Sequence, residues 1–308
     1  MKKLRVIAAT AVICSLGLVG CQNSDSGSSS SSKDGDKPTV ITTFTVLADM
    51  AKNVAGDHLN VVSITTPGAE IHDYQPKPAD IKKAADADLI INNGLGLERW
   101  FKRFVADSKA PTVDVSKGVT PMPIADGPEK NEPNPHAWMS PKNGEIYVDN
   151  MEKAFAKIDP KHADDYKANA EKYKQKIENI SKTMTDELES LPKSQRVLVT
   201  CEGAFSYLAR DTGMTEKYLW AVNAEGALKP QQVSDVEAYV KENKVPAVFC
   251  ESTVGDKMKP VVEATGAKFG GILYVDSLSG PKGDVPTYLD LLSYDAKTIT
   301  SALTGSGK

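Results

Sequence analysis

Two histidines and two acidic residues of this 308-residue chain stand where predicted strands end: His72, His136, Glu202 and Asp276. Imidazole nitrogens and carboxylate oxygens are ligands of divalent first-row metals, and two carboxylates would neutralise such an ion. Taken singly, a loop histidine is ordinary polar surface, and an acid can cap a helix or favour its first turn. Their shared position, two in each half of the chain, predicts a metal site. The other histidines, His58 and His162, are expected to be solvent-exposed.

The two halves are separated by a stretch that predicts one long helix, residues 159–192. Asp159 and Pro160 form a start signal, and Pro192 ends the run. At 1.5 Å per residue the helix is a rod of roughly 45 Å. A coiled-coil arm is one interpretation, but the patterns on either side favour a strut between two lobes. One apolar stripe follows from the spacing of Ala163, Tyr166, Ala170, Tyr173, Ile177, Ile180, Met184, Leu188 and Leu191.

Strand patterns alternate with helix patterns on both sides of this helix. Such alternation predicts an α/β fold, two β/α lobes with parallel sheets joined by one long backbone helix, with a ligand cleft at the carboxyl ends of the strands. We place the lobes at 38–158 and 193–308. In the first lobe, a helix is expected over 97–106, and Ser140-Pro141 is expected to start another. In the second lobe, residues 202–205 are expected to open a helix that ends near Thr212. The predicted strands are 39–45, 59–65, 88–92, 112–115, 196–200, 217–222, 247–250 and 267–275.

The N-terminus predicts export and a lipid anchor. Basic residues lead into the apolar run 6–20, which fits a secretory signal and is short for a membrane span. Small residues precede Cys21, as in bacterial lipoprotein signals, in which this cysteine is lipidated. We therefore assign 1–20 as a signal peptide and 21–37 as the lipidated cysteine with a disordered, Ser-rich tether. An ordinary signal peptide with an incidental cysteine is the alternative.

Cys201 and Cys250 remain in the exported part of the chain, where disulfides persist. Both stand at the ends of predicted strands, and neighbouring parallel strands would bring their Cα atoms within bridging range. A disulfide bond is favoured over two buried free thiols.

The composition and the motifs exclude several classes of function. A formal charge of −4 gives no basic footprint for nucleic acid. The chain has no HExxH, GxSxG or P-loop motif, and four protein ligands leave little room at a metal for substrate. We therefore expect no enzyme activity. A metalloenzyme and a surface adhesin stay as alternatives to a binding protein.

Five motifs resemble the metal-binding lipoproteins of bacterial manganese and iron ABC importers: GAEIHDYQPKPADI, NPHAWMSP, TCEGAFSYLARDTGM, FCEST and LYVDSLS. The resemblance covers essentially the whole mature chain. It implies that His72, His136, Glu202 and Asp276 ligate Mn²⁺, or alternatively Fe²⁺, as the transported ion. It also implies delivery to an ABC permease and its ATPase by a monomeric, lipid-anchored extracytoplasmic protein.

The zinc-specific branch of that family is similar, and a zinc receptor is the alternative reading. It typically has a histidine in place of Glu202 and a His-rich loop before the NPH motif. The loop before Asn134 has no histidine here, which argues against zinc. Binding requires neutral His72 and His136, so affinity is expected to fall below about pH 6.

Overall fold

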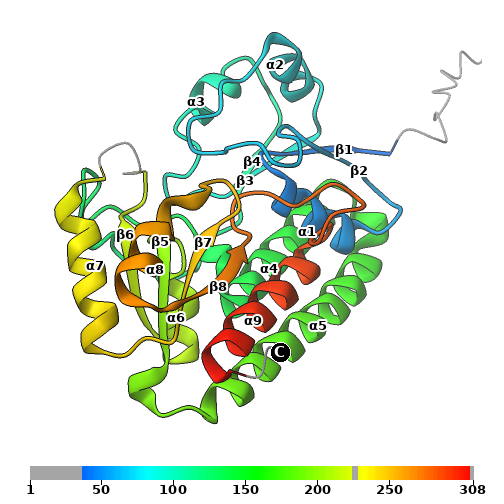
Figure 1. Cartoon of the computed structure of the whole chain (residues 1–308). Helices are drawn as coiled ribbons and strands as arrows, with labels where there is room; N and C mark the ends of the chain where they lie inside the picture. The colour runs from blue at the N-terminus through cyan, green and yellow to red at the C-terminus, as the bar shows by residue number, and fades with distance from the viewer. Residues whose placement is uncertain (1–36, 224–227, 306–308) are drawn as a thin grey trace, which may run out of the picture. The chain divides into compact units, whose positions relative to one another are not determined.

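A four-stranded parallel sheet forms the N-terminal lobe of the computed structural model, in the order β2-β1-β3-β4 (Figure 1). The structure describes residues 37–223 and 228–305, so the signal peptide, Cys21 and nearly all of the tether lie outside the described residues. All four predicted strands are present and parallel. The elements are β1 (Thr39–Thr42), α1 (Thr45–Ala55), β2 (Asn60–Ser63), α2 (Pro78–Ala85), β3 (Leu89–Asn92), α3 (Phe101–Phe104) and β4 (Thr112–Asp114).

The C-terminal lobe contains two parallel strand pairs, β5 with β6 and β7 with β8. β5 lies beside β7, but the two strands are not paired in one sheet. A disulfide bond between Cys201 and Cys250, whose Cα atoms are 4.9 Å apart, crosses this seam. The elements are β5 (Val197–Glu202), α6 (Ser206–Thr212), β6 (Thr215–Trp220), α7 (Pro230–Glu242), β7 (Ala247–Glu251), α8 (Lys259–Thr265) and β8 (Lys268–Leu273).

Two helix predictions need correction. Glu202 does not open a helix: it is the last residue of β5, and α6 begins at Ser206. The pairing with β6 continues past Glu202, because the Gly203 amide donates to the Trp220 carbonyl at 3.0 Å. The helix expected over 97–106 is reduced to α3, after a turn in which residues 94–96 all have positive φ.

The long helix is confirmed as α5 (Ala163–Glu189), preceded by a 3₁₀ turn at Pro160–His162. It is no free rod, because it packs against α1, α4 (Pro141–Ile158) and α9 (Tyr288–Thr304) (Figure 1). At 1.5 Å per residue its 27 residues span about 40 Å. Six residues of the predicted stripe form its buried face: Tyr166, Ala170, Tyr173, Ile177, Met184 and Leu188.

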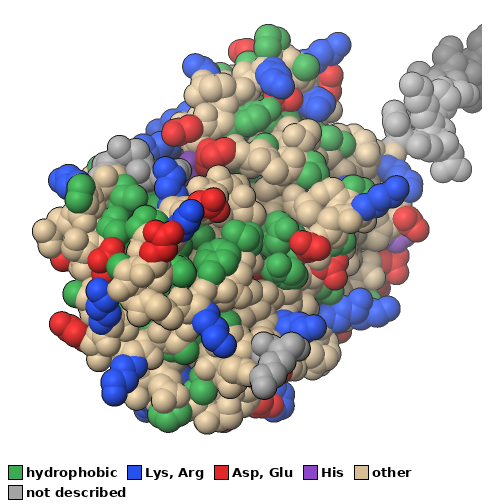
Figure 2. Space-filling view, viewed as in Figure 1, with side chains coloured by type: hydrophobic (Ala, Val, Ile, Leu, Met, Phe, Trp, Pro, Cys, Tyr) green, Lys and Arg blue, Asp and Glu red, His purple; other side chains and the backbone are tan. Residues whose placement is uncertain are grey.

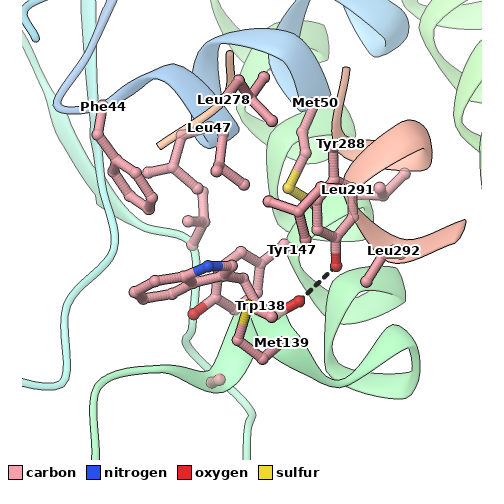
Figure 3. Packing of buried hydrophobic residues seen from close by; sticks show 14 of the residues in the cluster. Phe44, Leu47, Met50, Trp138, Met139, Tyr147, Leu278, Tyr288, Leu291 and Leu292 are labelled. Carbon is pink, nitrogen blue, oxygen red and sulfur yellow. Dashed lines mark hydrogen bonds between the residues drawn. The ribbon is translucent and has the colours of Figure 1, made fainter. Parts of the chain in front are cut away.

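Segments distant in the sequence meet in one hydrophobic core beside these helices. Figure 3 shows Phe44 and Met50 from the start of the chain together with Trp138, Tyr288 and residues of α9. The Tyr288 hydroxyl donates to the Trp138 carbonyl at 2.5 Å, which ties α9 to the segment before α4. The core therefore holds Trp138 and Leu278 beside α1 and α9, so segments from both halves of the chain share it.

The outer surface carries charges of both signs. On the face shown in Figure 2, Lys and Arg side chains are interspersed with Asp and Glu, and neither sign forms a continuous region. Within residues 37–223 and 228–305, no helix combines the length and the apolar composition needed to cross a bilayer.

Candidate metal centre

The structure brings the four predicted ligands together. Each offers one nitrogen or oxygen atom, and these four atoms all lie within 4.8 Å of one another. The Nε2 atoms of His72 and His136 are 3.2 Å apart. The Asp276 Oδ1 atom lies 3.8 Å from His72 Nε2 and 3.5 Å from His136 Nε2. Two imidazoles and two carboxyl groups therefore surround one point.

Each candidate ligand is held at the end of a strand or in a loop that follows one. His72 lies in the loop after β2, where the Glu70 carboxylate accepts the His72 and Asp73 amides at 3.0 Å each. Glu202 ends β5, and its Oε1 accepts the Asn223 amide at 3.0 Å. All four are buried, with relative exposures of 9% or less, and three of them line a cavity of about 450 Å³.

Asn134 sets the orientation of the His136 ring. Its Oδ1 accepts the His136 backbone amide at 3.0 Å and lies 3.0 Å from the ring Nδ1. Its Nδ2 donates to the Gly203 carbonyl at 2.7 Å, which fixes which end of the amide faces His136. The proton is therefore on Nδ1, and the Nε2 lone pair points to the shared point, as metal-binding histidines require.

Two buried polar atoms of the cluster, His72 Nδ1 and Asp276 Oδ1, have no hydrogen-bond partner among residues 37–223 and 228–305. Buried polar atoms normally have partners, because leaving them unpaired costs about 1–3 kcal/mol each. The Asp276 oxygen lies near both Nε2 atoms, so a cation bound among these three atoms would give that oxygen a partner. This donor set fits a divalent metal ion.

Burial changes which groups carry protons. Desolvation, with a further contribution from Asp276, raises the pKa of Glu202 to about 7. Desolvation also raises the pKa of Asp276 to about 6. The pKa values of His72 and His136 are lowered, again mainly by burial. Near neutral pH a metal ion would therefore compete with protons for the two carboxyl groups. The sequence-based expectation had placed this competition at the imidazoles.

Sequence reasoning missed an acid behind Glu202. The Glu202 amide donates to both carboxylate oxygens of Glu251, at 3.2 and 3.3 Å. Burial, together with the nearby Glu202, raises the pKa of Glu251 well above its ordinary value. The repeated Cys-Glu dipeptide was the available signal, since Cys201 and Cys250 each precede one of these acids.

The other two histidines lie outside the cluster, and each is paired with an aspartate. His58 and His162 stack with ring centroids 3.7 Å apart. His58 Nε2 is 3.0 Å from Asp165, and His162 Nδ1 is 2.6 Å from Asp159. Their side chains are about one-third exposed (31% and 28%), so they are partly covered rather than fully exposed as expected.

Comparison with known proteins gives consistent matches over most of the chain. Residues 40–302 match the family model described as ZnuA, zinc-uptake complex component A periplasmic. The iron-binding protein YfeA of Yersinia pestis is 53% identical over 262 residues, 84% of each chain. The manganese ABC transporter substrate-binding lipoprotein PsaA of Streptococcus mitis is 32% identical over 297 residues, 93% of this chain and 94% of PsaA.

A solved structure matches at a similar level. A Mn-bound mutant of the periplasmic metal-binding protein of Candidatus Liberibacter asiaticus superposes with a TM-score of 0.82 and 37% identity. The match covers 87% of this chain and 100% of the other.

Proposed function

Because the chain belongs to the ZnuA family and is a metal-binding receptor of an ABC importer, we propose that it captures Mn²⁺ with His72, His136, Glu202 and Asp276. The observation that carries the proposal is the convergence of four buried donor atoms within 4.8 Å. Two carboxylates offset the charge of the ion, which lowers the cost of removing it from water.

The choice of manganese rests on the donor set. Two oxygen-bearing ligands favour Mn²⁺ or Fe²⁺, whereas zinc and copper sites contain more nitrogen or sulfur. Relatives are named for manganese and for iron, and the family description names zinc. Fe²⁺ is the nearest alternative, and Zn²⁺ is the second.

Delivery of the ion to the membrane would depend on the proposed lipid anchor and on how far the packing of α5 lets the lobes move. Cys21 would carry the lipid that keeps the receptor at the membrane, and an ABC permease with its ATPase would receive the ion. The ion would lie in the cleft between the lobes at 38–158 and 193–308, which the helix 159–192 joins. Because α5 packs on α1, α4 and α9, we expect small lobe movements rather than wide closure. The proposal assigns no catalytic residue.

Competition titration of the metal-free protein tests the assignment. We expect one ion per chain and measurable binding of Mn²⁺ and Fe²⁺ in anaerobic buffer. Zn²⁺ should bind as well, because intrinsic affinity follows the Irving–Williams order. X-ray absorption of the manganese form should show two nitrogen and at least two oxygen donors. A folded protein that binds none of the three ions would refute the proposal.

Manganese affinity should fall as the pH is lowered through the range in which the carboxyl groups gain protons. With pKa values of about 7 for Glu202 and about 6 for Asp276, Mn²⁺ binding should weaken about 100-fold from pH 7.5 to pH 5.5. The sign follows because the metal binds the ionised carboxylates, and raised pKa values keep them protonated at higher pH. Calorimetry in two buffers should detect about one proton released per ion at pH 6.5. A constant affinity with no proton release would contradict the prediction.

A further inference from the structure

At three of the four candidate ligands, a side-chain N–H group donates a hydrogen bond to the backbone directly beside the ligand. In each case the acceptor is the carbonyl of the residue next to the ligand in the sequence, and the donor comes from a distant segment. The pairs are Asn134 Nδ2 to Gly203 O at 2.7 Å, Trp138 Nε1 to Val275 O at 3.1 Å, and Trp100 Nε1 to Ile71 O at 3.0 Å.

Two of these donors flank His136 itself. Asn134 precedes it by two residues and Trp138 follows it by two, so one short segment reaches the neighbours of both acids. Asn134 bonds the carbonyl after Glu202, and Trp138 bonds the carbonyl before Asp276. Since Asn134 also orients the His136 ring, the segment 134–138 fixes three ligands relative to one another.

The loop that carries Asn134 is anchored on the C-terminal lobe. Ile124 is buried in the hydrophobic cluster of that lobe. The Tyr207 hydroxyl accepts the Met122 amide at 3.1 Å and donates to the Asn134 carbonyl at 2.7 Å. The loop that leads to His136 is therefore fixed to the C-terminal lobe, which also carries Glu202, although His136 belongs to the N-terminal half of the sequence.

We propose that Asn134 and Trp138 are positioning residues that preorganise His136, Glu202 and Asp276, with Trp100 supporting His72 in the same way. The inference rests on the proposed metal site and adds to it the residues that set its affinity. All three donor side chains are buried, with relative exposures of 1%, 0% and 7%. Loss of the bond from Asn134 or Trp138 leaves the Gly203 or Val275 carbonyl without a hydrogen-bond partner among the described residues, whereas the Ile71 carbonyl keeps the Tyr74 amide at 3.5 Å. Outer partners of this kind typically contribute 10–100-fold to metal affinity.

Two substitutions test the proposal on the full chain with Mn²⁺ as the probe. Asn134→Ala and Trp138→Phe should each weaken Mn²⁺ binding about 10–100-fold. Asn150→Ala and Tyr166→Phe are the matched controls, since each removes a side-chain bond elsewhere: Asn150 to the Val115 carbonyl and Tyr166 to Asp159. Both controls should leave the affinity within about twofold.

A second measurement separates positioning from general destabilisation. In the metal-free wild type, long-range ¹H–¹⁵N spectra should show His136 protonated on Nδ1, and Asn134→Ala should shift the ring toward the Nε2–H form. If Trp138→Phe does not fold, benzothienylalanine at position 138 removes the N–H and keeps the ring shape. Unchanged affinity and tautomer in folded variants would overturn the proposal while the wild type still binds Mn²⁺. A wild type that binds no metal would instead refute the proposed function.

Discussion

His136→Ala should remove most of the stabilisation of the protein by Mn²⁺ while leaving the metal-free fold intact. His136 is fully buried, and its Nε2 is 3.2 Å from His72 Nε2 and 3.5 Å from Asp276. We expect the affinity to fall by more than the roughly 10–100-fold that an outer partner costs, because a donor atom itself is lost. At free Mn²⁺ 100 times the wild-type Kd, the wild type gains about 2.7 kcal/mol, whereas a 100-fold weaker variant gains about 0.4 kcal/mol.

His162→Ala is the matched control for this measurement. It removes a histidine that stacks on His58 and pairs with Asp159, away from the candidate ligands. Its Mn²⁺-dependent rise in unfolding temperature should equal that of the wild type. Equal rises in the His136 variant and the wild type would show that the ion binds elsewhere.

The fold was predictable where local patterns decide it. The apolar stripe of residues 163–191 and the start signal at Ser140-Pro141 correspond to α5 and α4, with Ser140 accepting the Asn143 amide as the N-cap. The same reasoning failed at α3, where consecutive positive φ angles at residues 94–96 delay the helix. It also missed that β5 and β7 are not paired in one sheet, because strand pairing depends on contacts that no local spacing encodes.

The candidate site shows the same division. His72 and Asp276 could be found because histidines and acids at strand ends are visible in the sequence. Asn134 and Trp138 could not be assigned, because their roles depend on carbonyls 69 and 137 residues away. The raised pKa values of Glu202 and Asp276 were equally hidden, because burial causes them and burial is a property of the fold.

Replacing Cys201 and Cys250 by alanine should destabilise the metal-free protein by about 4 kcal/mol. The estimate follows from the loop-closure entropy of a cross-link between residues 49 positions apart. Denaturant unfolding with and without a dithiol measures it. The reductant should lower the wild-type midpoint, because unfolding exposes the buried disulfide, and should leave the double variant unchanged. A wild-type midpoint that stays constant after complete reduction would contradict the prediction.

The same variant should lose more stability when saturated with Mn²⁺ than when metal-free. The disulfide crosses the seam between β5 and β7 one residue before Glu202, and the Glu202 amide bonds Glu251 across that seam. Loosening the seam should therefore weaken Mn²⁺ binding, and a tenfold weakening adds about 1.4 kcal/mol to the loss in the saturated state. Unfolding curves of both states in both proteins close this thermodynamic cycle. Equal losses in the two states would mean that the disulfide stabilises the lobe without fixing the position of Glu202.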